Sequence, residues 1–293
     1  MSVSKWLASC ASLLIAFSVS NVRAAVGDVG TFTAPERSFF TATYWIEGVD
    51  GVILIDTQFL PKEGVQALEL AEKSAGKKVV AAIVLHPNPD KFNGTAELQK
   101  RGIKVMTSKQ VKALIPSVHQ IRLSWFFEDY KPDYPNDAAN PDVFGEQTTD
   151  ITLAGVPLKL QVLGRGASGA HVVVQHGANV FVGDLINPKN HAWLELGFID
   201  DWLVRLTEIK AMNPTKIYPG RGPVGGASMI DTQATYLKRV QQIVRDENPS
   251  GELGNFTKLK MQWKIEREFP QLTLPIFMRD GLMEVWRSEG KRR

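Results

Sequence analysis

Apolar and polar residues along this chain follow two patterns, one typical of buried strands and the other of amphipathic helices. Short apolar runs bounded by turn residues, of which residues 79–85 are the clearest, predict strands. Apolar residues at helical spacing instead predict helices over residues 62–74, 90–101, 200–212 and 229–246. Strands that alternate with helices indicate an α/β fold with the helices on the outside.

Three further segments add detail to this pattern. Residues 44–57 predict a β-hairpin, because two apolar runs flank a turn made of Gly and Asp. Residues 118–144 carry aromatic side chains among Pro, Asp and Asn, which favours a loop over a pocket mouth, with an aromatic plug for the core as the alternative. The aromatic residues of segment 249–293 predict a C-terminal helical extension packed on the domain, with a homodimer contact as an open alternative.

The composition is compatible with one large domain, which we expect over residues 25–248, followed by the extension over residues 249–293. A chain of 293 residues with 44% hydrophobic content is long enough to bury a sizeable core. The formal net charge is only +3, and the one dense basic run lies at the very end of the chain. This mild charge does not indicate nucleic-acid binding.

The N-terminus has the features of a secretory signal peptide over residues 1–24. Lys5 precedes an apolar stretch too short to span a bilayer, and small residues suited to cleavage end at Ala24. We therefore expect a periplasmic or secreted protein that starts at Ala25 and has no stable membrane anchor after cleavage. A lipid anchor on Cys10 is disfavoured, because Cys10 precedes most of the apolar stretch. Since Cys10 is the one cysteine of the chain, the mature protein has neither disulfides nor thiolate ligands.

The chemistry of the chain concentrates after the predicted strand at residues 79–85. The loop that follows reads His-Pro-Asn-Pro-Asp-Lys-Phe-Asn-Gly over residues 86–94. This loop resembles the HxHxDHxxG metal-binding signature of the metallo-β-lactamase superfamily. His86, Asp90 and Gly94 match the signature, whereas Asn88 and Lys91 stand where two of its His residues belong.

The rest of the superfamily pattern follows in order over residues 38–248. The predicted hairpin resembles the opening strands of the family, and His171 begins an apolar run like the one that carries the next His ligand. Asp184 follows Gly183 as in the family's Gly-Asp element, and Arg221 replaces the last His within a Pro-Gly-x-Gly-Pro segment. The resemblance implies a four-layered αββα sandwich.

By motif position, the resemblance also implies the ligands of two metal sites. His86, Asn88, His171 and Asp184 would surround the first metal ion, and Asp90, Lys91, Asp184 and Arg221 the second. An ammonium or guanidinium group has no lone pair to offer at neutral pH, so Lys91 and Arg221 are poor ligands. We therefore expect at most one Zn or Fe ion, weakly bound at the first position.

The two substitutions preserve the formal charge of the second position. Loss of a divalent ion removes two positive charges, and replacement of two neutral His residues by Lys91 and Arg221 returns two. The hypothesis is that these cations stand in for the ion and pair with Asp90 and Asp184, which would otherwise repel each other. Asp90, Lys91 and Arg221 are accordingly the candidate catalytic residues, able to polarise a carbonyl group or hold an anion.

Three classes of function fit these observations. The first is an exported hydrolase that cleaves an ester, lactone, amide or thioester with one metal ion. The second is a metal-free protein that binds an anionic or carbonyl ligand through Lys91 and Arg221 without turnover. The third is an accessory protein that docks a partner through the aromatic segments. Hydrolysis of β-lactams is the least favoured activity, since the substituted positions are those that activate water.

Overall fold

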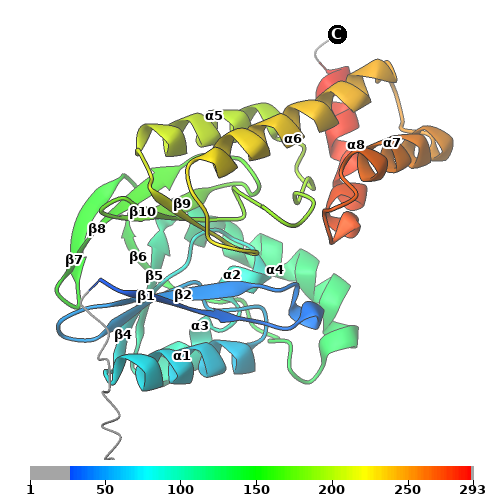
Figure 1. Ribbon diagram of the computed structural model, residues 1–293. Coiled ribbons are helices and arrows are strands. Elements are labelled where there is room, and N and C mark those ends of the chain that lie inside the picture. Colours follow the sequence, from blue (N-terminus) through cyan, green and yellow to red (C-terminus); the bar gives the residue numbers. More distant parts are fainter. Residues whose placement is uncertain (1–26, 292–293) are drawn as a thin grey trace, which may run out of the picture.

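Two β-sheets pack face to face between outer layers of helices (Figure 1). A computed structural model describes residues 27–291 of the chain. The predicted signal peptide, its cleavage site and Cys10 lie outside the described residues. The mixed α/β architecture, with its two sheets and C-terminal helices, confirms the predicted αββα sandwich.

The first sheet has six strands in the order β1-β2-β3-β4-β5-β6. Its first three strands are antiparallel, and β3 to β6 run parallel to one another. The predicted hairpin is confirmed as β2 and β3. The strands are β1 (Val29–Thr33), β2 (Ala42–Glu47), β3 (Val52–Ile55), β4 (Val79–Ile83), β5 (Lys104–Ser108) and β6 (Asp142–Gly145).

The second sheet has five strands in the order β11-β10-β9-β8-β7. β10 and β11 are parallel, and the other neighbours are antiparallel. The parallel pair is important for the site, because both strands end at the same edge. The strands are β7 (Thr149–Leu153), β8 (Val156–Leu163), β9 (His171–His176), β10 (Asn179–Gly183) and β11 (Lys216–Pro219).

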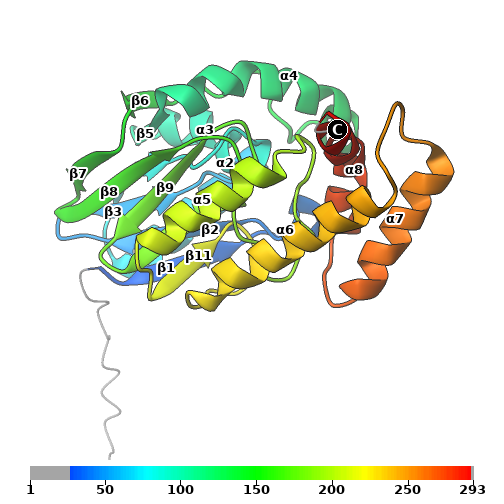
Figure 2. The ribbon, with the colours of Figure 1, turned by 90° about the horizontal axis from the view of Figure 1, so that it is seen from above.

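Helices cover the outer face of each sheet (Figures 1 and 2). The first sheet is contacted by α1 (Pro61–Ala75), α3 (Thr95–Lys100) and α4 (Lys109–Tyr130). The remaining elements are η1 (Glu36–Ser38), α2 (Pro89–Phe92), α5 (Ile199–Ala211), α6 (Ser228–Asp246), α7 (Asn255–Glu268) and α8 (Pro275–Gly290). Of these, α5, α6 and α8 pack on the second sheet through one shared apolar cluster.

The core is divided between the two faces of the second sheet. In β9, the side chains of Val172 and Val174 enter the cluster between the sheets, whereas Val173 enters the cluster under α5 and α6. This alternation follows from the two-residue period of a strand. Both faces of β9 are therefore apolar, which explains why the sequence reads there as a continuous apolar run.

Three of the four predicted helices are confirmed as α1, α5 and α6, whereas the fourth is interrupted. Residues 90–101 form α2 and α3, separated at Asn93 and Gly94. A Cβ atom on Gly94 would collide with the backbone oxygen of Thr57. The close approach of these two backbones holds the loop before α3 in place.

The expectation of a loop at residues 118–144 is wrong for its first half, which belongs to α4. Ser108 caps this helix, because its side chain accepts a hydrogen bond from the backbone N–H of Val111 at 3.2 Å. Phe126 and Tyr130 lie one turn apart, and their ring centroids are separated by 6.0 Å. The aromatic residues therefore had helical spacing that the polar composition of the segment obscured.

The C-terminal helices bury only part of their aromatic residues. Phe277 and Trp286 of α8 are buried, whereas Phe256 and Trp263 of α7 are 82% and 60% exposed. The predicted C-terminal helices are therefore confirmed, and α8 shares an apolar cluster with α5 and α6. Among residues 27–291, no helix combines the length and the apolar character that crossing a membrane would require.

Candidate functional site

The ends of several strands bring the predicted site residues together at one edge of the sandwich. Asp56 follows β3, Asp184 follows β10, and Arg221 lies two residues after β11. His86 lies in the loop after β4, and His171 begins β9 beside it, with the ring centroids of the two imidazoles 5.2 Å apart. Residues that are up to 165 positions apart in sequence thus share one buried site, whose distances are given below.

Lys91 lies at the centre of this site and has no exposed surface. Its Nζ atom is 2.9 Å from Oδ2 of Asp90, 3.0 Å from Oδ1 of Asp184 and 4.0 Å from Oδ2 of Asp56. Thr57 fixes the backbone of Lys91, because both its N–H and its hydroxyl donate to the Lys91 carbonyl, at 2.8 and 2.9 Å. The ammonium group is therefore held among three carboxyl groups.

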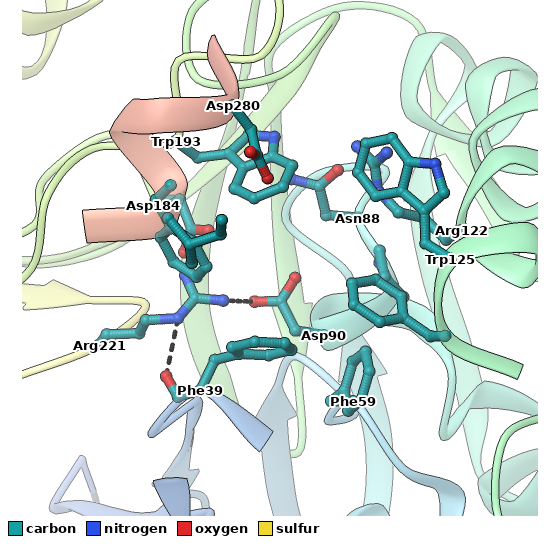
Figure 3. Close-up of a pocket in the computed structure, with 14 residues that line it drawn as sticks. Phe39, Phe59, Asn88, Asp90, Arg122, Trp125, Asp184, Trp193, Arg221 and Asp280 are labelled. Atoms are coloured by element: carbon teal, nitrogen blue, oxygen red, sulfur yellow. Dashed lines mark hydrogen bonds and ion pairs between the residues drawn. The ribbon is translucent and has the colours of Figure 1, made fainter. Parts of the chain in front are cut away.

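The three nitrogen atoms of the Arg221 guanidinium group each donate a hydrogen bond to a different residue of the site (Figure 3). One terminal nitrogen donates to Oδ2 of Asp184 at 2.5 Å, and the other donates to Oδ2 of Asp90. Its Nε donates to the backbone oxygen of Phe39 at 3.0 Å. The predicted ion pairs of Lys91 and Arg221 with the two aspartates are therefore confirmed.

The cations keep two of the buried carboxyl groups ionised. Burial alone would raise the pKa of Asp184, but Arg221 and Lys91 outweigh this effect and hold that pKa well below its usual range. The same balance of burial against the two cations lowers the pKa of Asp90. Asp56 differs, because burial raises its pKa to about 8 despite the nearby ammonium of Lys91. At neutral pH, two carboxylates therefore face two cations, and Asp56 is largely protonated.

Two glycines permit the close packing of this cluster. A Cβ atom on Gly220 would collide with Oδ1 of Asp184 and would lie 2.7 Å from Nζ of Lys91. Gly183 has a positive φ of 55°, and a Cβ atom there would lie 2.9 Å from the His86 ring. The glycines that precede Asp184 and Arg221 in sequence are therefore part of the site.

In both imidazoles, the Nε2 atom uses its lone pair to accept a hydrogen bond, whereas a metal ligand would offer that lone pair to the ion. Nε2 of His171 accepts from the backbone N–H of Ser168 at 3.0 Å, and Nε2 of His86 accepts from that of Asp184 at 3.4 Å. The ring proton then resides on Nδ1, which in both residues has no hydrogen-bond partner in the described structure. The pKa of His171 lies well below its usual range, mainly because the ring is buried and secondly because His86 is close by. The ring of His171 is therefore neutral.

These contacts decide how well the donor set fits a metal ion. At the second position, the carboxylates of Asp90 and Asp184 are engaged by cations that offer no lone pair. Within residues 27–291, no three His, Cys, Asp or Glu side chains are arranged to hold a metal ion. The donor set does not fit a metal ion at the second position.

A pocket of about 380 Å³ opens above the cluster. Asp90, Asp184, Arg221 and Asn88 contribute to its floor (Figure 3). Lys91 is completely buried and is not part of the lining. Aromatic residues form most of the wall. The lining residues that the sequence did not single out for the site are Phe39, Phe59, Pro89, Arg122, Trp193, Ile276, Phe277 and Asp280, in addition to Trp125 and Phe126 of the aromatic segment.

From its position shortly after the Gly-Asp element, the sequence predicts His191 as a further residue that lines the pocket, and this prediction is wrong. Its ring lies outside the pocket lining, and Nδ1 is 3.0 Å from the hydroxyl of Tyr236 on α6. His191 therefore serves the contact between its loop and α6. Asp56, near the end of the predicted hairpin, is a site residue to which the sequence assigned no role.

Comparisons with known proteins agree with the fold. The family model described as the metallo-beta-lactamase superfamily matches residues 37–221. The chain belongs to the metallo-beta-lactamase superfamily. The matched segment ends at Arg221, so it contains the complete set of predicted site residues.

Solved metallo-beta-lactamases share the fold at low sequence identity. One from Pontibacter korlensis is 19% identical, with a TM-score of 0.57 over 72% of this chain and 94% of that chain. FIM-1 from Pseudomonas aeruginosa, solved in a mono-zinc form, is 19% identical, with a TM-score of 0.55 over 72% and 89% of the two chains. One from Hirschia baltica is 22% identical, with a TM-score of 0.52 over 71% and 90%. No curated protein matches the chain.

Proposed function

We propose that this metallo-beta-lactamase-fold protein binds a small molecule without the help of a metal ion, in the pocket above the ion-pair cluster. The observation that carries the proposal is the position of Lys91, whose ammonium group lies 2.9 and 3.0 Å from Asp90 and Asp184. A metal ion at the second position would need the same carboxylate oxygens. The cluster supplies positive charge without a metal, and it cannot lower the pKa of a water molecule as a metal does.

The roles of the two cations differ from each other in this proposal. Lys91 is completely buried and acts by positioning Asp90 and Asp184. Arg221 lines the pocket, but its guanidinium is already bound to both carboxylates and to the Phe39 carbonyl. The polar group of the floor that is free to meet a ligand is the amide of Asn88, for which the described residues provide no hydrogen-bond partner.

The experiment compares the protein after chelation with the same protein supplied with zinc or iron. Trp125 and Trp193 line the pocket, so ligand binding is followed by their fluorescence while metal content is measured by elemental analysis. We expect saturable binding at the same affinity in both preparations. Binding that appears only in the metal-loaded preparation would refute the proposal.

A second candidate is the exported hydrolase with one weakly bound Zn or Fe ion at His86, Asn88, His171 and Asp184. The adjacency of the two buried imidazoles and the superfamily membership favour it. It requires the ion to displace the backbone hydrogen bonds that both rings now accept. Turnover of an ester, lactone, amide or thioester that rises with added metal, and that is lost in a His171→Ala variant, would select this candidate.

A further inference from the structure

The wall of the pocket is a closed circle of aromatic side chains. Phe39 contacts Phe277 at a centroid distance of 5.7 Å, Phe277 contacts Trp193 at 5.0 Å, and Trp193 contacts Trp125 at 6.3 Å. Phe126 closes the circle, at 6.3 Å from Trp125 and 5.8 Å from Phe39. These residues come from four separate parts of the chain, and their packing leaves the pocket of about 380 Å³ between them.

The cationic side chains of the pocket are already neutralised by protein carboxylates. Arg221 pairs with two aspartates on the floor. Arg122 forms a two-pronged pair with Glu195, and its guanidinium lies over the rings of Trp125 and Trp193, at 4.2 and 5.2 Å from their centroids. An anionic ligand would therefore have to compete with carboxylates that are already in place.

Asp280 is the charged group of the lining that lacks such a counter-ion. It lies one turn after Phe277 on α8, and its carboxylate is directed into the pocket (Figure 3). Within the described residues, its side chain forms neither a hydrogen bond nor an ion pair, although Lys258 and Glu195 act on it at longer range. The pocket thus combines an aromatic wall with one unmatched negative charge at its rim.

We infer that the pocket binds a small organic cation, with an ammonium group beside Asp280 and an apolar body among the aromatic rings. An ammonium is attracted by aromatic faces and by a carboxylate together, and aromatic pockets favour quaternary and substituted ammonium groups for this reason. A phenyl or short alkyl body matches the aromatic lining and the volume. This inference rests on the proposed function, because it assigns the class of ligand for the same pocket.

Three probes of similar size and different charge test the inference. Benzyltrimethylammonium, benzyl alcohol and phenylacetate are titrated into the full-length mature protein after chelation, with tryptophan fluorescence and calorimetry as readouts. We expect the cation to bind at least about 5-fold more tightly than the neutral probe, and the anion to bind most weakly. Raising the ionic strength should lower the affinity for the cation and leave the affinity for the neutral probe unchanged.

Two pairs of variants separate the charge from the rings. Asp280→Asn should reduce the affinity for the cation by about 3- to 10-fold and leave that for benzyl alcohol unchanged. Glu284→Gln is its control, because Glu284 lies on the same helix and pairs with Arg287 instead. Trp193→Leu should lower the affinity for the cation, whereas Trp263→Leu, which changes an exposed ring on α7, should not change it.

The outcomes distinguish this inference from the proposed function. Equal affinity for the three probes, or preference for phenylacetate, in metal-free protein would overturn the organic-cation inference and leave metal-independent binding intact. Binding of the cation only after addition of zinc would overturn the proposed function. Absence of saturable binding for all probes would overturn both. Preference for the cation that Asp280→Asn removes and Glu284→Gln retains would support both.

Discussion

The Nζ atom of Lys91 lies 3.0 Å from the Oδ1 atom of Asp184, and both side chains are almost completely buried. Desolvation of an ammonium and a carboxylate is costly, so such a pair persists only where each charge has good partners. Here Asp90 and Arg221 complete the set, which makes two cations and two ionised carboxylates. The pair therefore depends on its neighbours, and each member should be sensitive to loss of any other.

Lys91→Met should destabilise the protein, since it leaves Asp90 and Asp184 with one cation between them. Breaking a buried ion pair by removal of one partner costs about 3–5 kcal/mol. Urea unfolding monitored by tryptophan fluorescence measures the loss. Lys100→Met is the matched control, because Lys100 is exposed and pairs with Glu97 on the surface, and it should cost less than about 1 kcal/mol. Equal stabilities of the two variants would contradict the prediction.

Lys91→His combined with Arg221→His should create a metal site at the second position. The two imidazoles would join Asp90 and Asp184, which gives a set of nitrogen and oxygen donors that zinc accepts. We expect zinc to raise the thermal stability of this variant and to appear in elemental analysis. The control is the double change to Gln, which removes the same charges without adding ligands. The idea fails if both double variants retain the same amount of zinc.

Most of the fold was readable from the sequence because its strands and helices have regular apolar periods. The run at residues 79–85 gave β4, and the helical spacing gave α1, α5 and α6. Prediction failed at α4, where aromatic residues at helical spacing lie among polar ones. Local composition suggested a loop, but Phe126 contacts Phe59, which is distant in sequence, and Tyr134, which follows α4, and these contacts help to hold the helix.

The site was predicted in part, because the motif fixed the positions of its polar residues and not of its aromatic wall. The balance of charges between Lys91, Arg221 and the aspartates followed from the residue types at the motif positions. Trp193 and Asp280 carried no comparable signal, since Trp193 lies in the loop between β10 and α5, and Asp280 reaches the pocket only through the packing of α8 on the domain. Such residues become visible only when the chain is folded.

The N-terminal segment predicts processing during export. The protein expressed with its own leader should be recovered from the periplasm or medium with Ala25 as its first residue. N-terminal sequencing and intact-mass measurement check this result. An uncleaved leader, or a lipid attached to Cys10, would show that the segment is not a cleaved signal peptide.

Gly220→Ala should disrupt the cluster without changing its charges. The added Cβ atom would meet Oδ1 of Asp184 and would lie 2.7 Å from Nζ of Lys91, so the ion pair must shift. Overpacking of a buried site costs about 1–3 kcal/mol, measured here by urea unfolding. Gly254→Ala is the control, because nothing lies within 4 Å of its Cβ position. A Gly220→Ala variant as stable as this control would show that the packing is looser than the distances indicate.

Asp56→Asn should change the pH dependence of stability, because the pKa of Asp56 is raised by burial to about 8. Between the unfolded pKa of about 3.9 and the folded value, the folded chain keeps a proton that the unfolded chain releases. Asp56 thus adds to the free energy of unfolding at low pH, and this contribution is lost as the pH rises toward 8, by about 1.4 kcal/mol per pH unit. Asn cannot titrate and tolerates the positive φ of 67° at this position.

The difference in unfolding free energy between wild type and Asp56→Asn isolates this group, since other titrations are common to both proteins. From pH 5 to pH 7.5 the difference should move in favour of the variant by about 1.4 kcal/mol per pH unit. Asp50→Asn, at an exposed turn, is the control for the loss of a carboxylate at the surface. A constant difference for Asp56→Asn would mean that Asp56 is ionised in the folded protein, and that Lys91 then faces three charged carboxylates instead of two.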